Sequence, residues 1–152
     1  MKAKYLFLFL FIIFTVAIGT NVSAQKNIEP AHDPILEQDA KHNLDVARQA
    51  FGPAKKAYKQ VLMRFEETFA AYPEFSAMDE FLYMAGMSSY YLSKNQGKQK
   101  VNLKSDREKN KYAPEKLRED AVAYLSLLIE KNPQTQYKDE AEKVIAELKT
   151  SN

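Results

Sequence analysis

Histidine, carboxylate and hydroxyl side chains are the groups of this chain that could act as acids, bases, nucleophiles or metal ligands. The two histidines, His32 and His42, are ten positions apart and do not form the His-Glu-x-x-His spacing that holds zinc on a helix face. Solvent-exposed surface histidines are therefore the simpler interpretation. The 152 residues contain no cysteine, which excludes thiolate nucleophiles and cysteine-ligated metals within them.

Pairs of adjacent acidic residues also lack the arrangement that catalysis requires. They occur at residues 66–67, 79–80, 119–120 and 139–140. General acid and base work needs two carboxyls in one cleft with separated pKa values, whereas adjacent helical residues point about 100° apart. Ser88 and Ser89 lie in an apolar run, and no histidine is placed to activate them. We therefore predict no enzyme, no catalytic residue, no cofactor and no metal site.

The first segment of the chain has the pattern of an export signal. Lys2 and Lys4 precede an apolar run over residues 5–18, and Val22-Ser23-Ala24 follows it. The run is shorter than the roughly 20 residues that a membrane-spanning helix requires. We predict a signal peptide over residues 1–24, cleaved after Ala24, and a periplasmic or exported protein. Retention of the segment as an uncleaved anchor is the alternative.

The charge of the remaining chain argues against nucleic acid as a partner. Lys2 and Lys4 account for the whole formal net charge of +2, so residues 25–152 are formally neutral. Overall basicity, the usual electrostatic footprint of a nucleic-acid-binding protein, is therefore missing from the predicted mature chain.

Residues 33–150 are predicted to form one all-α domain, preceded by a disordered segment over residues 25–32. Apolar residues recur at spacings of three and four in five runs, which indicates about five helices. Asp33 and Pro34 suit the cap and first position of the first helix, and Gly52 suits a left-handed cap at its end. Ser76 and Asp79 resemble a capping box for the third helix. That helix is apolar nearly all round, so we expect it at the centre of the domain.

Residues 94–113 interrupt the helical pattern with a basic segment. Seven basic side chains stand against two acidic ones, and only Val101 and Leu103 are large and apolar before residue 112. So little apolar surface does not offset the entropy of ordering the segment, and we predict a long flexible loop. Lys98, Lys100 and Lys104 are candidates to contact an acidic protein or anionic lipid headgroups. A solvated linker is the alternative.

One short pattern occurs twice. Residues 72–80 read Tyr-Pro-Glu-Phe-Ser-Ala-Met-Asp-Glu, and residues 132–140 read Asn-Pro-Gln-Thr-Gln-Tyr-Lys-Asp-Glu. Each copy ends one apolar run at a proline and starts another with two acids. Recurrence of this kind is typical of helical-repeat proteins, which stack neighbouring units and present a groove to other molecules.

The residues around these turns resemble a known repeat class. Residues 79–92 are similar to the first helix of a tetratricopeptide repeat, with Gly86 as the small residue where the paired helix approaches closely. Ala121 and Leu125 resemble the small and large positions of a second helix, and Pro73 and Pro133 the closing prolines. The resemblance implies a right-handed superhelical stack of tetratricopeptide-like hairpins.

The turn Tyr-Pro-Glu-Phe-Ser followed by Asp-Glu-x-Leu-Tyr resembles in particular the BamD-like family of outer-membrane β-barrel assembly factors, over residues 36–148. Proteins of that family are normally longer lipoproteins whose signal peptide ends at a lipidated cysteine, whereas this chain offers no cysteine for such an anchor. The resemblance implies a non-enzymatic scaffold that binds a partner protein in barrel assembly or envelope maintenance, including a place peripheral to the outer membrane.

Candidate contact residues and rival functions complete the prediction. Tyr83, Met87 and Tyr90 lie along one edge of the third helix, where aromatic and methionine side chains suit a binding surface; a role in the core is the alternative. A peptidoglycan-associated or secretion-system adaptor would use the same surface for another partner. A binder of anionic membrane surfaces would use the lysines instead. An enzyme would need a cleft with converging polar groups, which the periodicity does not supply.

Overall fold

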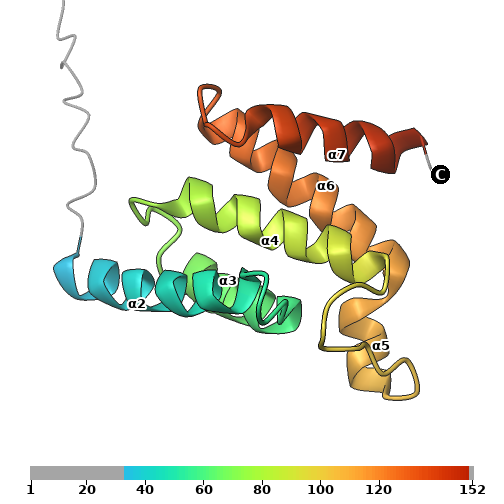
Figure 1. Ribbon diagram of the computed structural model, residues 1–152. Coiled ribbons are helices and arrows are strands. Elements are labelled where there is room, and N and C mark those ends of the chain that lie inside the picture. The colour runs from blue at the N-terminus through green and yellow to red at the C-terminus, as the bar shows by residue number, and fades with distance from the viewer. Residues whose placement is uncertain (1–32, 151–152) are drawn as a thin grey trace, which may run out of the picture. The chain divides into compact units, whose positions relative to one another are not determined.

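The computed structural model describes residues 33–150, which form helices and no strand (Figure 1). The helices are α2 (Pro34–Phe51), α3 (Tyr58–Ala71), α4 (Met78–Ser93), α5 (Asp106–Tyr112), α6 (Pro114–Lys131) and α7 (Lys138–Thr150). The predicted all-α class is confirmed, and α5 is added to the five expected helices. The predicted signal peptide and the predicted disordered segment lie outside the described residues. None of the helices within residues 33–150 has the length and apolar character needed to cross a membrane.

The five longer helices pack as adjacent pairs, and contacts between pairs arrange them in two rows (Figure 1). In one row, Arg48 of α2 forms an ion pair with Glu80 of α4, and Tyr83 of α4 stacks on Tyr137, next to α7. In the other row, Phe65 of α3 contacts the ring of Tyr124 on α6. This is the arrangement of stacked helical hairpins. The right-handed superhelical twist of the stack stays a prediction.

Helix α4 lies at the centre of the packing, as its sequence predicts. It contacts α2, α3 and α6, and most of its residues are buried. Phe81, Leu82 and Ala85 are fully buried on it. A helix that buries side chains on several sides needs no polar face, which explains why the apolar residues of α4 show no clear stripe.

The two proline turns have the same backbone structure. In the first, the amide of Tyr72 donates to Thr68 O, that of Phe75 to Tyr72 O and that of Met78 to Phe75 O. In the second, the corresponding amides, each 60 positions later, belong to Asn132, Thr135 and Lys138, and they donate to carbonyls with the same spacing. Phe75 and Thr135 are the buried residues of their turns. The sequence echo is therefore a structural repeat.

The helix ends agree with the sequence only in part. Asp33 Oδ1 accepts from the amides of Ile35 and Leu36, so it caps α2 as predicted. Gly52 has φ −52°, and the predicted left-handed cap is wrong. The predicted capping box is also wrong, because no side chain caps α4 and the Ser76 hydroxyl donates to Glu37 of α2.

The segment over residues 94–113 contains more helix than predicted. It includes α5 at residues 106–112, where a loop was predicted, and the flexibility of the segment stays a prediction. Polar contacts supply what apolar burial does not: Lys59 Nζ lies 2.8 Å from Glu108 Oε2, and Lys111 pairs with Glu66 of α3. The segment separates α4 from α6, which pack together as one pair. It is therefore an insertion between the two helices of one hairpin.

Candidate functional site

The predicted repeat positions meet where α4 and α6 cross. A Cβ atom on Gly86 would lie 2.5 Å from Leu125 Cγ and 3.5 Å from the carbonyl oxygen of Ala121. Ala121 and Leu125 are fully buried. The absence of a side chain at Gly86 thus lets α6 approach α4 closely enough to bury both residues. Pro73 and Pro133 occupy equivalent positions in the two repeated turns.

The predicted contact edge of α4 divides between core and surface. Met87 is only 2% exposed, so its assignment to a partner surface is wrong: it packs inside the domain. Tyr83 and Tyr90 are half-buried and pack at the margin of the core. The sequence could not separate these residues, because α4 is apolar on all sides.

Tyr83 and Tyr90 both reach α7. The rings of Tyr83 and Tyr137 stack with centroids 4.2 Å apart and planes 11° apart, and Tyr83 Oη donates to Glu140 Oε2 at 2.6 Å. Tyr90 Oη donates to Glu147 Oε2 at 2.7 Å. Burial and the nearby Glu140 carboxylate raise the pKa of Tyr83, so it remains a neutral donor. These contacts hold α7 against α4, and contact of either ring with a partner stays a prediction.

The contact between α4 and α7 should depend on pH through Glu147. Hydrogen bonds from Lys94 and Tyr90 lower the pKa of Glu147 below its ordinary value of 4.5. A carboxylate with a lowered folded-state pKa stabilises the fold above its unfolded-state pKa, and this stabilisation is lost as pH falls through the folded-state value. We expect Glu147→Gln to be less stable than wild type at neutral pH, with the two converging below pH 4.5. Urea denaturation at several pH values measures this, and a constant difference at all pH values would contradict it.

The predicted lysines lie away from this edge. Lys98 Nζ donates to Ala54 O at 2.7 Å, and Lys100 Nζ donates to Asn95 O at 2.8 Å. The backbone amide of Lys104 donates to Asn102 Oδ1 at 3.1 Å. All three side chains are exposed. The structure therefore does not combine them with the tyrosines in one site.

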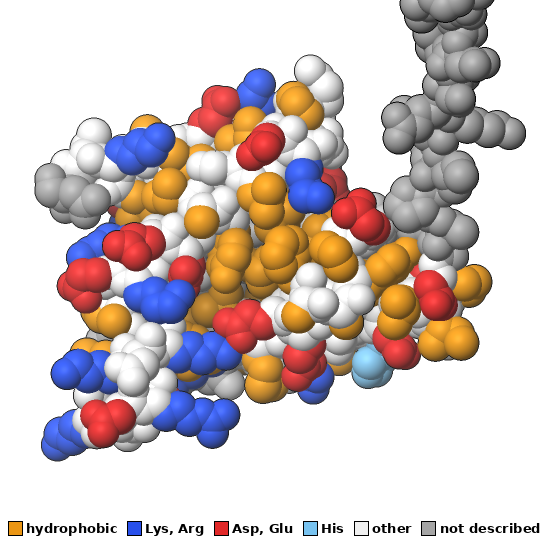
Figure 2. Space-filling view, turned by 180° about the vertical axis from the view of Figure 1, so that it is seen from behind, with side chains coloured by type: hydrophobic (Ala, Val, Ile, Leu, Met, Phe, Trp, Pro, Cys, Tyr) orange, Lys and Arg blue, Asp and Glu red, His pale blue; other side chains and the backbone are white. Residues whose placement is uncertain are grey.

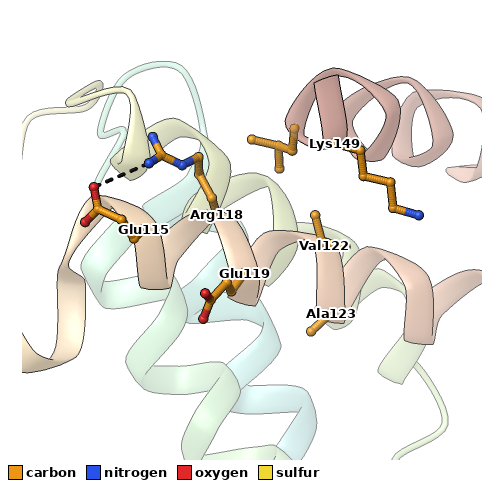
Figure 3. A pocket seen from close by; sticks show the side chains of 7 residues that line it. Glu115, Arg118, Glu119, Val122, Ala123 and Lys149 are labelled. Carbon is orange, nitrogen blue, oxygen red and sulfur yellow. Dashed lines mark hydrogen bonds and ion pairs between the residues drawn. The ribbon is translucent and has the colours of Figure 1, made fainter. Parts of the chain in front are cut away.

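A groove that the sequence did not reveal lies between α6 and α7 (Figure 3). Its volume is about 460 Å³. The lining residues are Glu115, Arg118, Glu119, Val122 and Ala123 of α6 and Leu148 and Lys149 of α7. Figure 3 shows Val122 pointing from α6 toward α7, with the Glu115 and Arg118 ion pair at one end and Lys149 at the other. The groove thus offers an apolar middle with charged ends.

The spacing of the groove residues on α6 was the available signal. Glu115, Arg118, Glu119 and Val122 follow at three, four and seven positions, which places them on one helical face. In sequence this face reads as solvated, because three of the four residues are charged. Only the placement of α7 beside it turns the face into one wall of a groove.

Hydrophobic side chains also gather across the middle of the face shown in Figure 2. Among the described residues, Met63 of α3 is 42% exposed, and Phe69 of α3 and Leu127 of α6 are only partly buried. Exposed apolar clusters commonly mark surfaces that bind other proteins.

In the described part of the chain, the candidate metal ligands and serines do not form a shared site. Within residues 33–150, no three His, Cys, Asp or Glu residues are close enough to hold a metal ion. Ser88 and Ser89 are fully buried, and their hydroxyl oxygens have no hydrogen-bond partner among the described residues. Both serines lie on α4 in the core of the domain, where they serve as small packing residues.

Comparison with known protein families gives a match over most of the chain. A family model described as YfiO, outer membrane lipoprotein, matches residues 20–151. No curated protein and no solved structure matches the chain significantly. The family match includes every described helix, both proline turns and the basic insertion.

Proposed function

The chain belongs to the YfiO family of outer membrane lipoproteins, the BamD-like family, and we propose that it is a non-enzymatic scaffold that binds a partner protein in outer-membrane β-barrel assembly. The observation that carries this proposal is the extent of the match, which spans the whole helical domain and not a single hairpin. Membership implies a place in the cell envelope, in association with the outer membrane. A scaffold role also accords with stacked hairpins, which present extended surfaces to partners.

The groove between α6 and α7 is the proposed docking site for a helix of the partner. Inside the domain, α6 packs on α4 through Gly86 and contacts α3 through Tyr124. A helix in the groove would lie against α7 and α6 in the same manner and would continue the stack. Val122 and Leu148 would receive its apolar row, and the charged groove ends would pair with its flanks.

Tyr83 and Tyr90 support this site by fixing α7. Their contacts with Tyr137, Glu140 and Glu147 set the position of α7 relative to α4. The position of Leu148 and Lys149 at the groove depends on that placement, since both residues belong to the last turn of α7. We therefore propose an indirect contribution of the two tyrosines to partner binding.

A charged substitution in the middle of the groove tests whether the partner docks there. We expect Val122→Glu to reduce capture of barrel-assembly components from solubilised envelopes by at least about tenfold, because docking would bury a carboxylate where an apolar side chain lines the groove. Ala146→Glu, at an exposed position of α7 outside the groove lining, is the matched control and should capture as wild type does. Thermal melts of both variants check that the fold is retained.

Two results would contradict the proposal. If a folded Val122→Glu variant captured barrel-assembly components as well as wild type does, the groove would not be the docking site. Capture of cell-wall enzymes in place of barrel-assembly components would favour the adaptor function that the sequence leaves as an alternative.

A further inference from the structure

Basic side chains from two distant segments meet at the part of the domain that carries α5. The turn over residues 52–57 carries Lys55 and Lys56, and the insertion over residues 94–113 lies against it. Lys98 contributes two contacts: its amide donates to Lys56 O at 3.1 Å, and its Nζ donates to Ala54 O at 2.7 Å. Figure 2 shows Lys and Arg side chains gathered at the lower left of the face drawn there.

This basic patch has few compensating carboxylates. Its exposed cations are Lys55, Lys56, Lys98, Lys100, Lys104, Arg107 and Lys109. None of these seven forms an ion pair with another residue of the described range, although Lys59, Lys94 and Lys111 around them do. The insertion contains two acids. Glu108 forms an ion pair with Lys59, whereas Asp106 is exposed and forms no ion pair with another described residue. The patch is therefore strongly positive.

The backbone of the insertion packs closely against the turn over residues 52–57. Gly97 has φ +94°, and a Cβ atom there would lie 2.8 Å from Lys56 O and 2.7 Å from Tyr58 Cδ2. Lys56 itself has φ +46°. The insertion thus fits closely onto the turn, which places Lys98 beside Lys56.

An apolar side chain projects from the same segment. Leu103 is 50% exposed and lies between Lys100 and Lys104 in the sequence, directly beside Lys104. Binding of an acidic protein would require only the cations of the patch. An exposed leucine among lysines fits a lipid surface better, because the leucine can enter the acyl boundary while the ammonium groups remain at the headgroups.

We propose that the basic patch binds an anionic membrane surface, with Lys98, Lys100 and Lys104 at the lipid headgroups and Leu103 inserted between them. The patch would bring the helical domain to the membrane through its own side chains. The patch does not share a residue with the groove, and membrane binding is independent of the partner proposed above.

Vesicle flotation tests the proposal on the protein isolated from the cell envelope, with its N-terminus determined by mass. We expect binding to phosphatidylcholine vesicles that contain phosphatidylglycerol, and at least about tenfold weaker binding without it. Each lysine at a charged surface accounts for roughly fivefold in affinity, so Lys98→Glu/Lys100→Glu/Lys104→Glu should bind at least about 100-fold more weakly. Added salt should weaken the wild type in the same direction.

A matched variant separates the patch from net charge. Lys41→Glu/Lys131→Glu/Lys143→Glu changes the same number of exposed lysines elsewhere and should retain most of the binding. Leu103→Ser should weaken binding without changing its salt dependence. Equal binding by the two triple variants, or no preference of the wild type for phosphatidylglycerol, would overturn the proposal. A patch that binds an acidic protein but no vesicle would overturn it as well.

Discussion

Gly86→Leu is expected to lower the free energy of unfolding by about 3 kcal/mol or more, because the closed contact between α4 and α6 has no room for a side chain. Already a Cβ atom would lie 2.5 Å and 2.6 Å from Leu125 Cγ and Cδ2, far inside contact distance. Leu125 is fully buried and cannot turn toward solvent. Urea denaturation followed by circular dichroism measures the loss.

Two further variants make this prediction specific. Gly52→Leu is the matched control, since a Cβ atom there would meet nothing closer than 3.5 Å and its φ of −52° suits any residue. Its expected effect is within about 0.5 kcal/mol. Leu125→Ala alone should cost about 2–5 kcal/mol, but combined with Gly86→Leu it should cost less than the sum of the two, because each residue fills the space of the other. Additive losses would contradict direct contact between these positions.

Phe65→Ala is expected to remove about 3–5 kcal/mol, a large part of the total stability of a small domain. The ring is 1% exposed, and its centroid lies 5.7 Å from that of Phe81 on α4 and 4.8 Å from that of Tyr124 on α6. One side chain of α3 thus packs on two other helices. Met63→Ala is the control on the same helix, and because Met63 is 42% exposed its loss should be below about 1 kcal/mol.

Phe65→Ala also tests whether the hairpins unfold together. Because Phe65 connects α3 with α6, its loss should weaken the contact between successive pairs and broaden the urea transition or split it in two. Fluorescence from tryptophans placed separately in the two pairs would follow each part. Equal losses for Phe65→Ala and Met63→Ala would mean that Phe65 does not join the hairpins.

The helices and their central contact could be predicted because they depend on local pattern. Apolar spacing determines which face of a helix is buried, and the repeated proline turns have equivalent hydrogen bonds. The resemblance of residues 79–92 to a tetratricopeptide helix identified Gly86 as the position of close helix approach, and Gly86 faces Ala121 and Leu125 in the structure. These features need no knowledge of distant parts of the chain.

The errors come from contacts between residues far apart in sequence. Ser76 was available as a cap for α4, but its hydroxyl bonds to Glu37, 39 residues earlier. The basic insertion contacts Lys59 and Glu66 of α3, which no local pattern connects to it. Met87 occupies the core because α4 is covered on several sides.

The groove could not be predicted for the same reason. Its two walls come from α6 and α7, and its middle depends on how Val122 and Leu148 are placed relative to each other. Each helix alone shows an ordinary amphipathic pattern. Only tertiary packing decides that the charged face of α6 borders a groove.

Site-specific photocrosslinking in intact cells tests the central claim most directly. A photoreactive residue at Ala123, which is exposed and lines the groove, should crosslink to a component of the outer-membrane β-barrel assembly machinery. The same residue at Gln38, exposed on α2 away from the groove, should not. Equal crosslinking from both positions, or crosslinks from Ala123 only to proteins outside barrel assembly, would contradict a docking scaffold that acts through this groove.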